Sequence, residues 1–113
     1  MKIKESYHGK VVVLEIKGDL VGGPVTQEIH NKMKLLLSEG FRSFVVDLGS
    51  VKWMNSSGLG ILMSCLTSAT EKDGELKIAR AAQKVQSLFM ITQLTKVFHN
   101  YDSVEKAVAS FEL

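Results

Sequence analysis

The apolar run Phe44-Val45-Val46 constrains the fold of this chain more than any other feature. A strand with one solvated face alternates apolar and polar residues, whereas a strand covered on both faces is apolar throughout. The run therefore predicts a strand over residues 41–48 that other elements cover on both sides. Such a strand is typical of a layered α/β domain.

Strand-like and helix-like segments alternate along the rest of the chain. Apolar spacing and turn residues predict further strands at 3–7, 11–17, 76–79 and 97–98. Helices are predicted over 24–38, from Ser56 to a stop near Gly74, around 85–92 and over about 104–111. The order predicts an N-terminal hairpin followed by largely parallel strands with right-handed crossovers. Because no repeat or linker interrupts it, we expect residues 1–113 to form a single α/β domain with a mixed sheet and about four helices.

Two finer expectations concern the packing and capping of these helices. The helix that opens at Ser56 has apolar residues at helical spacing, which predicts a buried stripe of Leu59, Leu62, Met63 and Leu66. Asp102 and Glu105 have the spacing of a capping box at the start of the last helix. Cys65, the only cysteine, lies among apolar helical residues, so we expect a buried thiol and no intramolecular disulfide.

Charge and hydropathy exclude several classes of protein. The net charge is +2 and the lysines are scattered along the chain, which argues against a nucleic acid or an anionic membrane as partner. No apolar run approaches the roughly 20 residues that span a bilayer, and the N-terminus lacks the apolar core of a signal peptide. The expected setting is a reduced, cytoplasmic one.

The tract Asn55-Ser-Ser-Gly-Leu-Gly60 lies between the end of a strand and the start of a helix. Ligands of open α/β sheets meet the protein at the carboxyl ends of strands, and the first N–H groups of a helix are unpaired. A serine there can cap the helix, or its hydroxyl can face outward and accept a phosphate. Gly58 and Gly60 each weaken a helix by about 1 kcal/mol relative to alanine, but they leave its first turn bare for a contact. Both a cap and an exposed contact or anion site remain open, and Trp53 either packs under the tract or faces a partner.

No catalytic or metal-binding pattern is present in the sequence. The chain lacks both the G-x-S-x-G elbow of serine hydrolases and the phosphate-binding P-loop. His8, His30 and His99 have no spacing that places a base beside Ser56, and no His/Cys cluster has metal-ligand spacing. We therefore predict no catalytic residue, no metal and no cofactor, and we disfavour a small hydrolase that uses Ser56 or Ser57.

The tract and its flanks resemble a known family. The stretch VVDLGSVKWMNSSGLGILM resembles the signature of STAS domains of the free-standing bacterial anti-sigma factor antagonists, in which Asp-Ser-Ser-Gly-Leu-Gly opens a helix after a strand that ends in Asp-Leu. The upstream VVVLEIKGDL and the downstream VQSLFMITQLTKVFHNYDSVEKAV are similar to the corresponding segments of that family. The resemblance covers nearly the whole chain and implies a STAS fold.

The resemblance also implies a function and a site. Such proteins bind an anti-sigma factor, usually a serine kinase of the histidine-kinase-like ATPase fold, and thereby release a sigma factor. The kinase phosphorylates the first serine of the motif, which corresponds to Ser56, and a PP2C-type phosphatase removes the phosphate. Because bare glycines permit close approach, the expected partner-binding residues are Asn55, Ser56, Ser57, Gly58, Leu59 and Gly60, with Gly22 and Gly23 of the Val21-Gly22-Gly23 loop.

One departure from the family pattern keeps a second interpretation open. Asn55 stands where the family has aspartate, so the shape of the side chain is retained and its negative charge is lost. The alternative is a constitutive STAS adaptor in a signalling assembly, without phosphorylation of Ser56. Binding of a lipid or nucleotide at the helix N-terminus is a further possibility for this fold.

Overall fold

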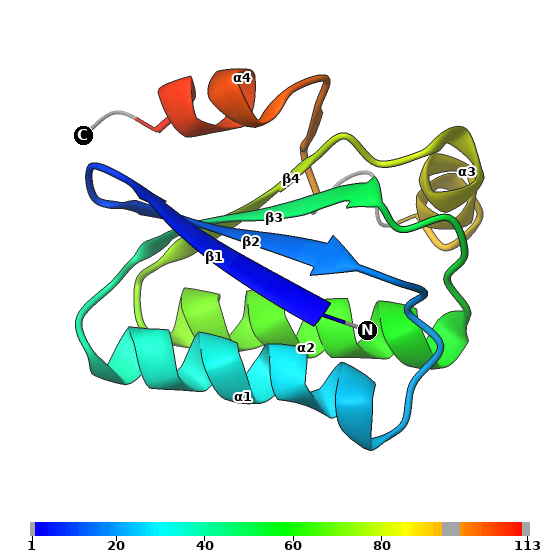
Figure 1. The fold of residues 1–113 in the computed structure, drawn as a ribbon, viewed down its shortest axis with the longest axis horizontal. Helices are drawn as coiled ribbons and strands as arrows, with labels where there is room; N and C mark the ends of the chain where they lie inside the picture. The colour runs from blue at the N-terminus through cyan, green and yellow to red at the C-terminus, as the bar shows by residue number, and fades with distance from the viewer. Residues whose placement is uncertain (1, 94–97, 112–113) are drawn as a thin grey trace.

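The computed structural model describes residues 2–93 and 98–111, and it has the predicted alternation of strands and helices (Figure 1). The strands are β1 (Lys2–His8), β2 (Val11–Lys17), β3 (Ser43–Ser50), β4 (Glu75–Ala79) and β5 (Asn100–Tyr101). The helices are α1 (Pro24–Ser38), α2 (Ser56–Glu71), α3 (Gln83–Ile91) and α4 (Val104–Ala109). The α/β class is confirmed.

The strands form one mixed sheet in the order β1-β2-β3-β4-β5. β1 and β2 pair antiparallel around the Gly9-Lys10 turn, which confirms the N-terminal hairpin. β2 with β3, β3 with β4, and β4 with β5 pair parallel, as expected for strands that alternate with helices. The carboxyl ends of β2, β3 and β4 therefore lie at the same edge of the sheet.

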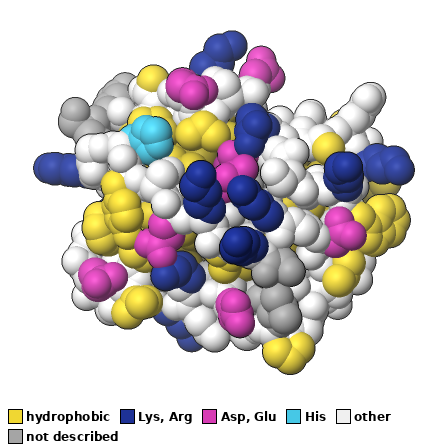
Figure 2. All heavy atoms as spheres, viewed as in Figure 1, with side chains coloured by type: hydrophobic (Ala, Val, Ile, Leu, Met, Phe, Trp, Pro, Cys, Tyr) yellow, Lys and Arg dark blue, Asp and Glu magenta, His cyan; other side chains and the backbone are white. Residues whose placement is uncertain are grey.

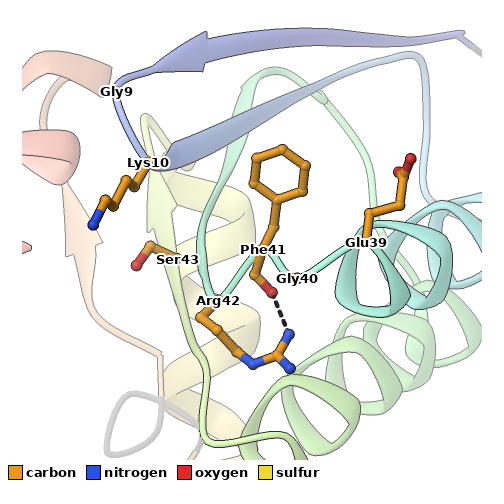
Figure 3. A pocket seen from close by; sticks show the side chains of 7 residues that line it. All are labelled: Gly9, Lys10, Glu39, Gly40, Phe41, Arg42 and Ser43. Carbon is orange, nitrogen blue, oxygen red and sulfur yellow. Dashed lines mark hydrogen bonds between the residues drawn. The ribbon is translucent and has the colours of Figure 1, made fainter.

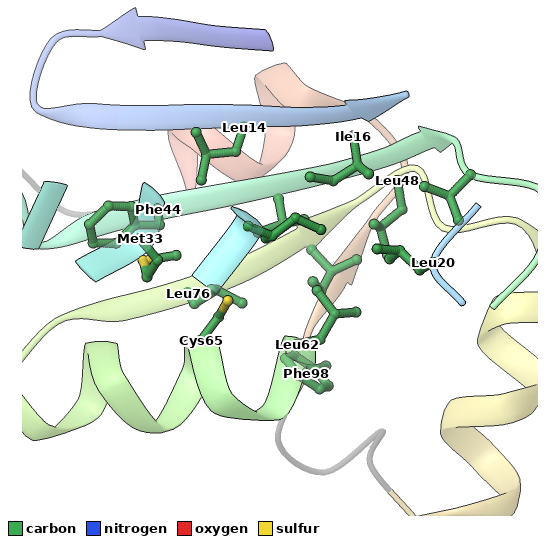
Figure 4. Close-up of a cluster of buried hydrophobic side chains, with 14 of the residues drawn as sticks. Leu14, Ile16, Leu20, Met33, Phe44, Leu48, Leu62, Cys65, Leu76 and Phe98 are labelled. Carbon is green, nitrogen blue, oxygen red and sulfur yellow. The ribbon is translucent and has the colours of Figure 1, made fainter. Parts of the chain in front are cut away.

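Helices cover both faces of the sheet, as the apolar run in β3 predicts. α1 and α2 lie side by side on one face and α4 lies on the other (Figure 1). Phe44 points into the larger core cluster (Figure 4), on the face that α1 and α2 cover. Val46 belongs to the same cluster. Val45 points the other way, into a smaller cluster with Ala107 and Phe111 at α4. All three residues of the run are fully buried.

α2 is rotated slightly from the predicted orientation. Leu59 and Leu62 are buried as expected, but Met63 and Leu66 are only half-buried at the margin of the core. The buried face of α2 consists of Gly58, Leu59, Leu62, Cys65 and Ala69. Three of these residues have small side chains, so this face can lie close to its neighbours, and the larger Met63 and Leu66 lie beside it. The expected burial of Cys65 is confirmed.

Two expectations in the C-terminal segment are wrong. The sequence predicts the last strand at residues 97–98, but the strand is Asn100–Tyr101, paired with Ile78 and Ala79; Val97 lies outside the described residues. Phe98 is instead a core side chain that stacks on Phe89 of α3, with ring centroids 5.3 Å apart. Its side chain is apolar because it packs against this helix and not because it belongs to a strand. The cap of α4 is also Ser103 rather than Asp102, because the Ser103 Oγ accepts a hydrogen bond from the Lys106 N–H at 3.1 Å.

Candidate partner-binding site at the start of α2

The site expected from the sequence lies at the carboxyl edge of the sheet, where two loops meet. The segment that follows β2 makes a parallel bridge between Leu20 and Met54, in the loop that follows β3. The Leu20 N–H donates to the Trp53 carbonyl at 3.0 Å, and the Asn55 N–H donates to the Leu20 carbonyl at 3.1 Å. The structure thus brings the Val21 loop (residues 18–23) next to the first turn of α2, as the sequence predicts for Gly22 and Gly23.

Asn55 caps α2. Its backbone is extended, and its Oδ1 accepts a hydrogen bond from the Gly58 N–H at 3.0 Å. This is the standard geometry of a helix N-cap, in which a side-chain oxygen satisfies one of the unpaired N–H groups of the first turn. Its Nδ2 also donates to the Val21 carbonyl at 3.0 Å. The capping role that a serine of the tract could have filled therefore belongs to Asn55.

Ser56 and Ser57 do not serve as caps. Both residues are exposed, which confirms the expected accessibility of Ser56. In the part of the chain that the structure describes, neither hydroxyl takes part in a hydrogen bond within the protein. The Ser56 hydroxyl therefore stands at the positive end of a helix with both its donor and its acceptor available.

Gly58 corrects the expectation of a bare first turn. It is buried, and a Cβ atom placed on it would lie 2.0 Å from the Leu20 carbonyl oxygen and 2.5 Å from the Leu20 carbonyl carbon. Glycine is thus required at this position so that α2 can approach the Leu20 backbone. Leu59 is also buried, at 6% exposure, and so offers little surface to a partner. Gly60 differs from both, because it is exposed and a Cβ atom there would have no atom of the described residues within 4 Å.

The glycines of the Val21 loop also differ from each other. Gly22 has φ +91°, and a Cβ there would lie 2.7 Å from the Ser57 Cβ, so the loop backbone rests directly on Ser57. Gly23 has φ +89°, and no described residue lies within 4 Å of a Cβ placed on it. Gly22 is therefore required for contact between the Val21 loop and the first turn of α2, whereas Gly23 is required only for its backbone conformation.

Two apolar side chains beside Ser56 are exposed. Val21 is 46% exposed and Trp53 is 54% exposed, which resolves the two alternatives for Trp53 in favour of the surface. Leu20 and Met54, which form the parallel bridge, are both buried. Because side chains alternate along an extended chain, the exposed Val21 and Trp53 lie on the side opposite to the buried Leu20 and Met54. The bare glycines of the loop predict an accessible backbone at Val21, but nothing in the sequence indicates that its side chain is exposed.

An ion cluster that the sequence does not indicate lies at the same edge, on the α4 face of the sheet. The Arg80 guanidinium donates to both carboxylate oxygens of Asp47, at 2.9 and 2.7 Å, and lies 3.6 Å from Glu15. Its hydrogen bonds to Asp47 and the Asp47 charge raise the pKa of Arg80. Asp47 is only 4% exposed and also accepts from the Gly49 N–H. The cluster ties the carboxyl half of β3 to Arg80, the residue after β4, and so holds in place the strand that leads into the loop with Trp53.

Among the described residues, no side chain bonds to Ser56 as a catalytic base would. His30 is a residue of α1, and its Nε2 lies 2.8 Å from the Oγ of Ser68 in α2. Burial, and to a lesser extent the Lys34 charge, lower the pKa of His30. Within residues 2–93 and 98–111, no group of three or more His, Cys, Asp or Glu side chains could hold a metal ion. Nor does any helix described there have the length and apolar character of a membrane-spanning segment.

The other surface features lie away from this site. A hollow of about 360 Å³ occurs at the amino end of β3, lined by Gly9, Lys10, Glu39, Gly40, Phe41, Arg42 and Ser43 (Figure 3). Its arginine is already engaged, because the Arg42 Nη1 donates to the Phe41 and Leu37 carbonyls. On the face shown in Figure 2, basic side chains are interspersed with acidic ones. The carboxyl edge with Ser56 therefore remains the candidate site.

Known proteins with similar sequences and structures have been found. The family model of the STAS domain matches residues 3–107. The anti-sigma-B factor antagonist of Staphylococcus aureus (strain NCTC 8325 / PS 47) is 27% identical over 107 residues, which cover 93% of this chain and 96% of that protein. An anti-sigma factor antagonist from Mycobacterium paratuberculosis has a TM-score of 0.80 at 21% identity, covering 96% of this chain and 92% of that one. The Bacillus cell fate determinant SpoIIAA, in its phosphorylated form, has a TM-score of 0.75 at 15% identity, covering 96% of this chain and 97% of that one.

Proposed function

The chain belongs to the STAS domain family, and from this premise we propose that it is an anti-sigma factor antagonist controlled by phosphorylation of Ser56. It binds an anti-sigma factor, a serine kinase of the histidine-kinase-like ATPase fold, and so releases a sigma factor. The name of its Staphylococcus aureus relative supports this role. In this role the protein is a binding module and not an enzyme, and it acts in the cytoplasm as a single domain over residues 1–113.

The observation that carries the proposal is the free hydroxyl of Ser56. Asn55 provides the helix cap, so among residues 2–93 and 98–111 the exposed Ser56 hydroxyl has no hydrogen bond to give up when it is modified. A phosphate adds about −1.5 to −2 charges at neutral pH. At a helix N-terminus such a charge is tolerated or favourable by roughly 0.3–1 kcal/mol. The fold is therefore expected to survive phosphorylation, in keeping with the solved phosphorylated form of SpoIIAA.

The same charge disrupts the pairing with the anti-sigma factor. The proposed contact surface consists of Asn55, Ser56, Ser57 and Gly60, with Gly22 and Gly23 of the Val21 loop, whereas the buried Gly58 and Leu59 support it from below. A charge desolvated in an interface without a partner costs on the order of several kcal/mol. Even about 3 kcal/mol lowers an affinity roughly a hundredfold. Phosphorylation thus switches the complex off, and a PP2C-type phosphatase restores it.

Two neighbouring exposed serines provide a matched test. We would incubate the protein with its anti-sigma factor kinase and ATP, then measure intact mass and map phosphopeptides. Wild type and Ser57→Ala should gain one phosphate, whereas Ser56→Ala should gain none and still bind the partner. Ser56→Asp should fold normally and bind about a hundredfold more weakly. A phosphate that maps only to Ser57 would defeat the assignment.

A constitutive adaptor is the second candidate, and Asn55 is the observation that favours it. The neutral amide replaces the carboxylate found beside the modified serine in the resembled family, and both of its polar atoms are already engaged within the protein. A kinase that orients its substrate serine through that carboxylate would find no charge here. Absence of any mass shift with a kinase shown to be active and bound would establish the adaptor in place of the switch.

A further inference from the structure

Asn55 links the Val21 loop to the first turn of α2 through three of its polar groups. Its backbone N–H donates to the Leu20 carbonyl, its Nδ2 donates to the Val21 carbonyl, and its Oδ1 accepts from the Gly58 N–H. The three distances lie between 3.0 and 3.1 Å. One residue is therefore bonded to the Val21 loop and to the first turn of α2 at the same time.

Only an amide can make both side-chain bonds. A carboxylate at position 55 would still accept from the Gly58 N–H, but it has no hydrogen to donate to the Val21 carbonyl. Its second oxygen would instead face the Val21 carbonyl oxygen, an acceptor against an acceptor. A serine would likewise keep a capping oxygen, but it is neutral and lacks the amide donor. The bond to Val21 is thus specific to asparagine among good helix caps.

The bond to the Val21 carbonyl holds apolar surface in place. Val21 is next to Leu20, whose backbone is fixed against Trp53 and Asn55, and the following Gly22 rests on Ser57. The exposed Val21 and Trp53 side chains consequently lie on the same outward side of the two paired loops. Loops with exposed apolar tips lose this arrangement easily, because few buried contacts oppose their motion.

We propose that Asn55 is a positioning residue that clasps the Val21 loop to the first turn of α2, so that Val21, Trp53 and Ser56 form one preformed contact surface. The identity of the partner, an anti-sigma factor, rests on the function proposed above. A surface ordered before binding loses less conformational entropy on association. The partner that fits it covers Val21 and Trp53 with apolar side chains of its own and does not need a cation opposite position 55.

Amide hydrogen exchange on the isolated protein tests the clasp without any partner. The reporter is the Leu20 N–H, which bonds to the Trp53 carbonyl across the two loops, and the reference is the Val45 N–H in the central strand. Asn55→Asp and Asn55→Ser should both raise Leu20 exchange roughly two- to tenfold, the value for one lost hydrogen bond, while Val45 exchange changes less. Ser103→Ala, which removes the cap of the distant α4, is the matched control and should leave Leu20 unchanged.

Binding measurements on the same variants complete the test. Affinity for the anti-sigma factor should fall in Asn55→Asp and Asn55→Ser by a similar factor, and Ser103→Ala should bind like wild type. Unchanged Leu20 exchange in both Asn55 variants would overturn the clasp. A loss of affinity in Asn55→Asp alone, with Asn55→Ser like wild type, would show that charge and not positioning governs binding and would overturn it as well. Failure of the wild-type protein to bind any anti-sigma factor would instead count against the proposed function, because the exchange result does not depend on a partner.

Discussion

Gly58→Ala should destabilise the protein, even though alanine is the better helix former. Alanine at an open helical position gains about 1 kcal/mol over glycine. At position 58, however, the added methyl would lie 2.0 Å from the Leu20 carbonyl oxygen and 2.8 Å from the Leu20 Cβ. Ordinary contacts between carbon atoms need roughly 3.5 Å, so either α2 or the Leu20 backbone must move by about 1 Å or more.

The cost of that movement can be estimated from the contacts it breaks. Overpacking of a tight site typically costs about 1–3 kcal/mol. Movement of Leu20 away from α2 also strains the hydrogen bonds that Asn55 donates to the Leu20 and Val21 carbonyls, each worth about 1 kcal/mol. After the gain in helix propensity is subtracted, we expect a net loss of about 2–3 kcal/mol in the free energy of unfolding.

Urea denaturation of Gly58→Ala and of the matched variant Gly60→Ala measures this loss of stability. Gly60→Ala lies two residues further along the same helix, where no part of the chain that the structure describes is within 4 Å of the new methyl group. That variant should be as stable as wild type or more stable, by up to about 1 kcal/mol. If Gly58→Ala matched or exceeded Gly60→Ala in stability, the contact between α2 and the Leu20 backbone would be refuted as the reason for this glycine.

Buried groups lead to three more predictions. Leu62→Ala, which empties a fully buried site, should cost about 2–5 kcal/mol in denaturant unfolding, and a loss below about 1 kcal/mol would place the α2 core elsewhere. Burial raises the pKa of the Cys65 thiol to about 12, so a thiol reagent at about pH 8 should label it only after unfolding, and rapid labelling of the native protein would contradict its burial. Burial lowers the pKa of His30, so the unfolded chain binds the proton more readily, and stability should fall as pH drops from about 7 to 5, below the unfolded pKa of about 6.5. In His30→Gln the midpoint of thermal unfolding should depend less on pH across that range than in wild type. The same dependence on pH in both proteins would exclude His30 as its cause.

The elements that can be predicted from sequence are those that local chemistry defines. α1 begins and ends where expected because Pro24 suits the first turn and Gly40 follows the last residues of the helix. β3 is predictable because a strand buried on both faces needs an uninterrupted apolar run. The strand predicted at residues 97–98 and the cap predicted at Asp102 are wrong because packing in the fold, and not local chemistry, decides these features. Phe98 is apolar because it stacks on Phe89, and Asp102 and Ser103 are both capable caps, so only the fold selects between them.

The glycines of the tract show where prediction of the site fails and what could have improved it. Gly58 and Gly60 look equivalent locally, and both suggest a turn left bare for a partner. They are separated by about 200° around a helix, however, so they cannot both face the same neighbour. Gly58 is in phase with Leu62, Cys65 and Ala69, which form the buried face of α2, whereas Gly60 lies on the exposed side. The helical phase therefore assigns Gly58 to packing and Gly60 to the surface. The backbone of Leu20, which is distant in the chain, is a contact that only the fold could provide.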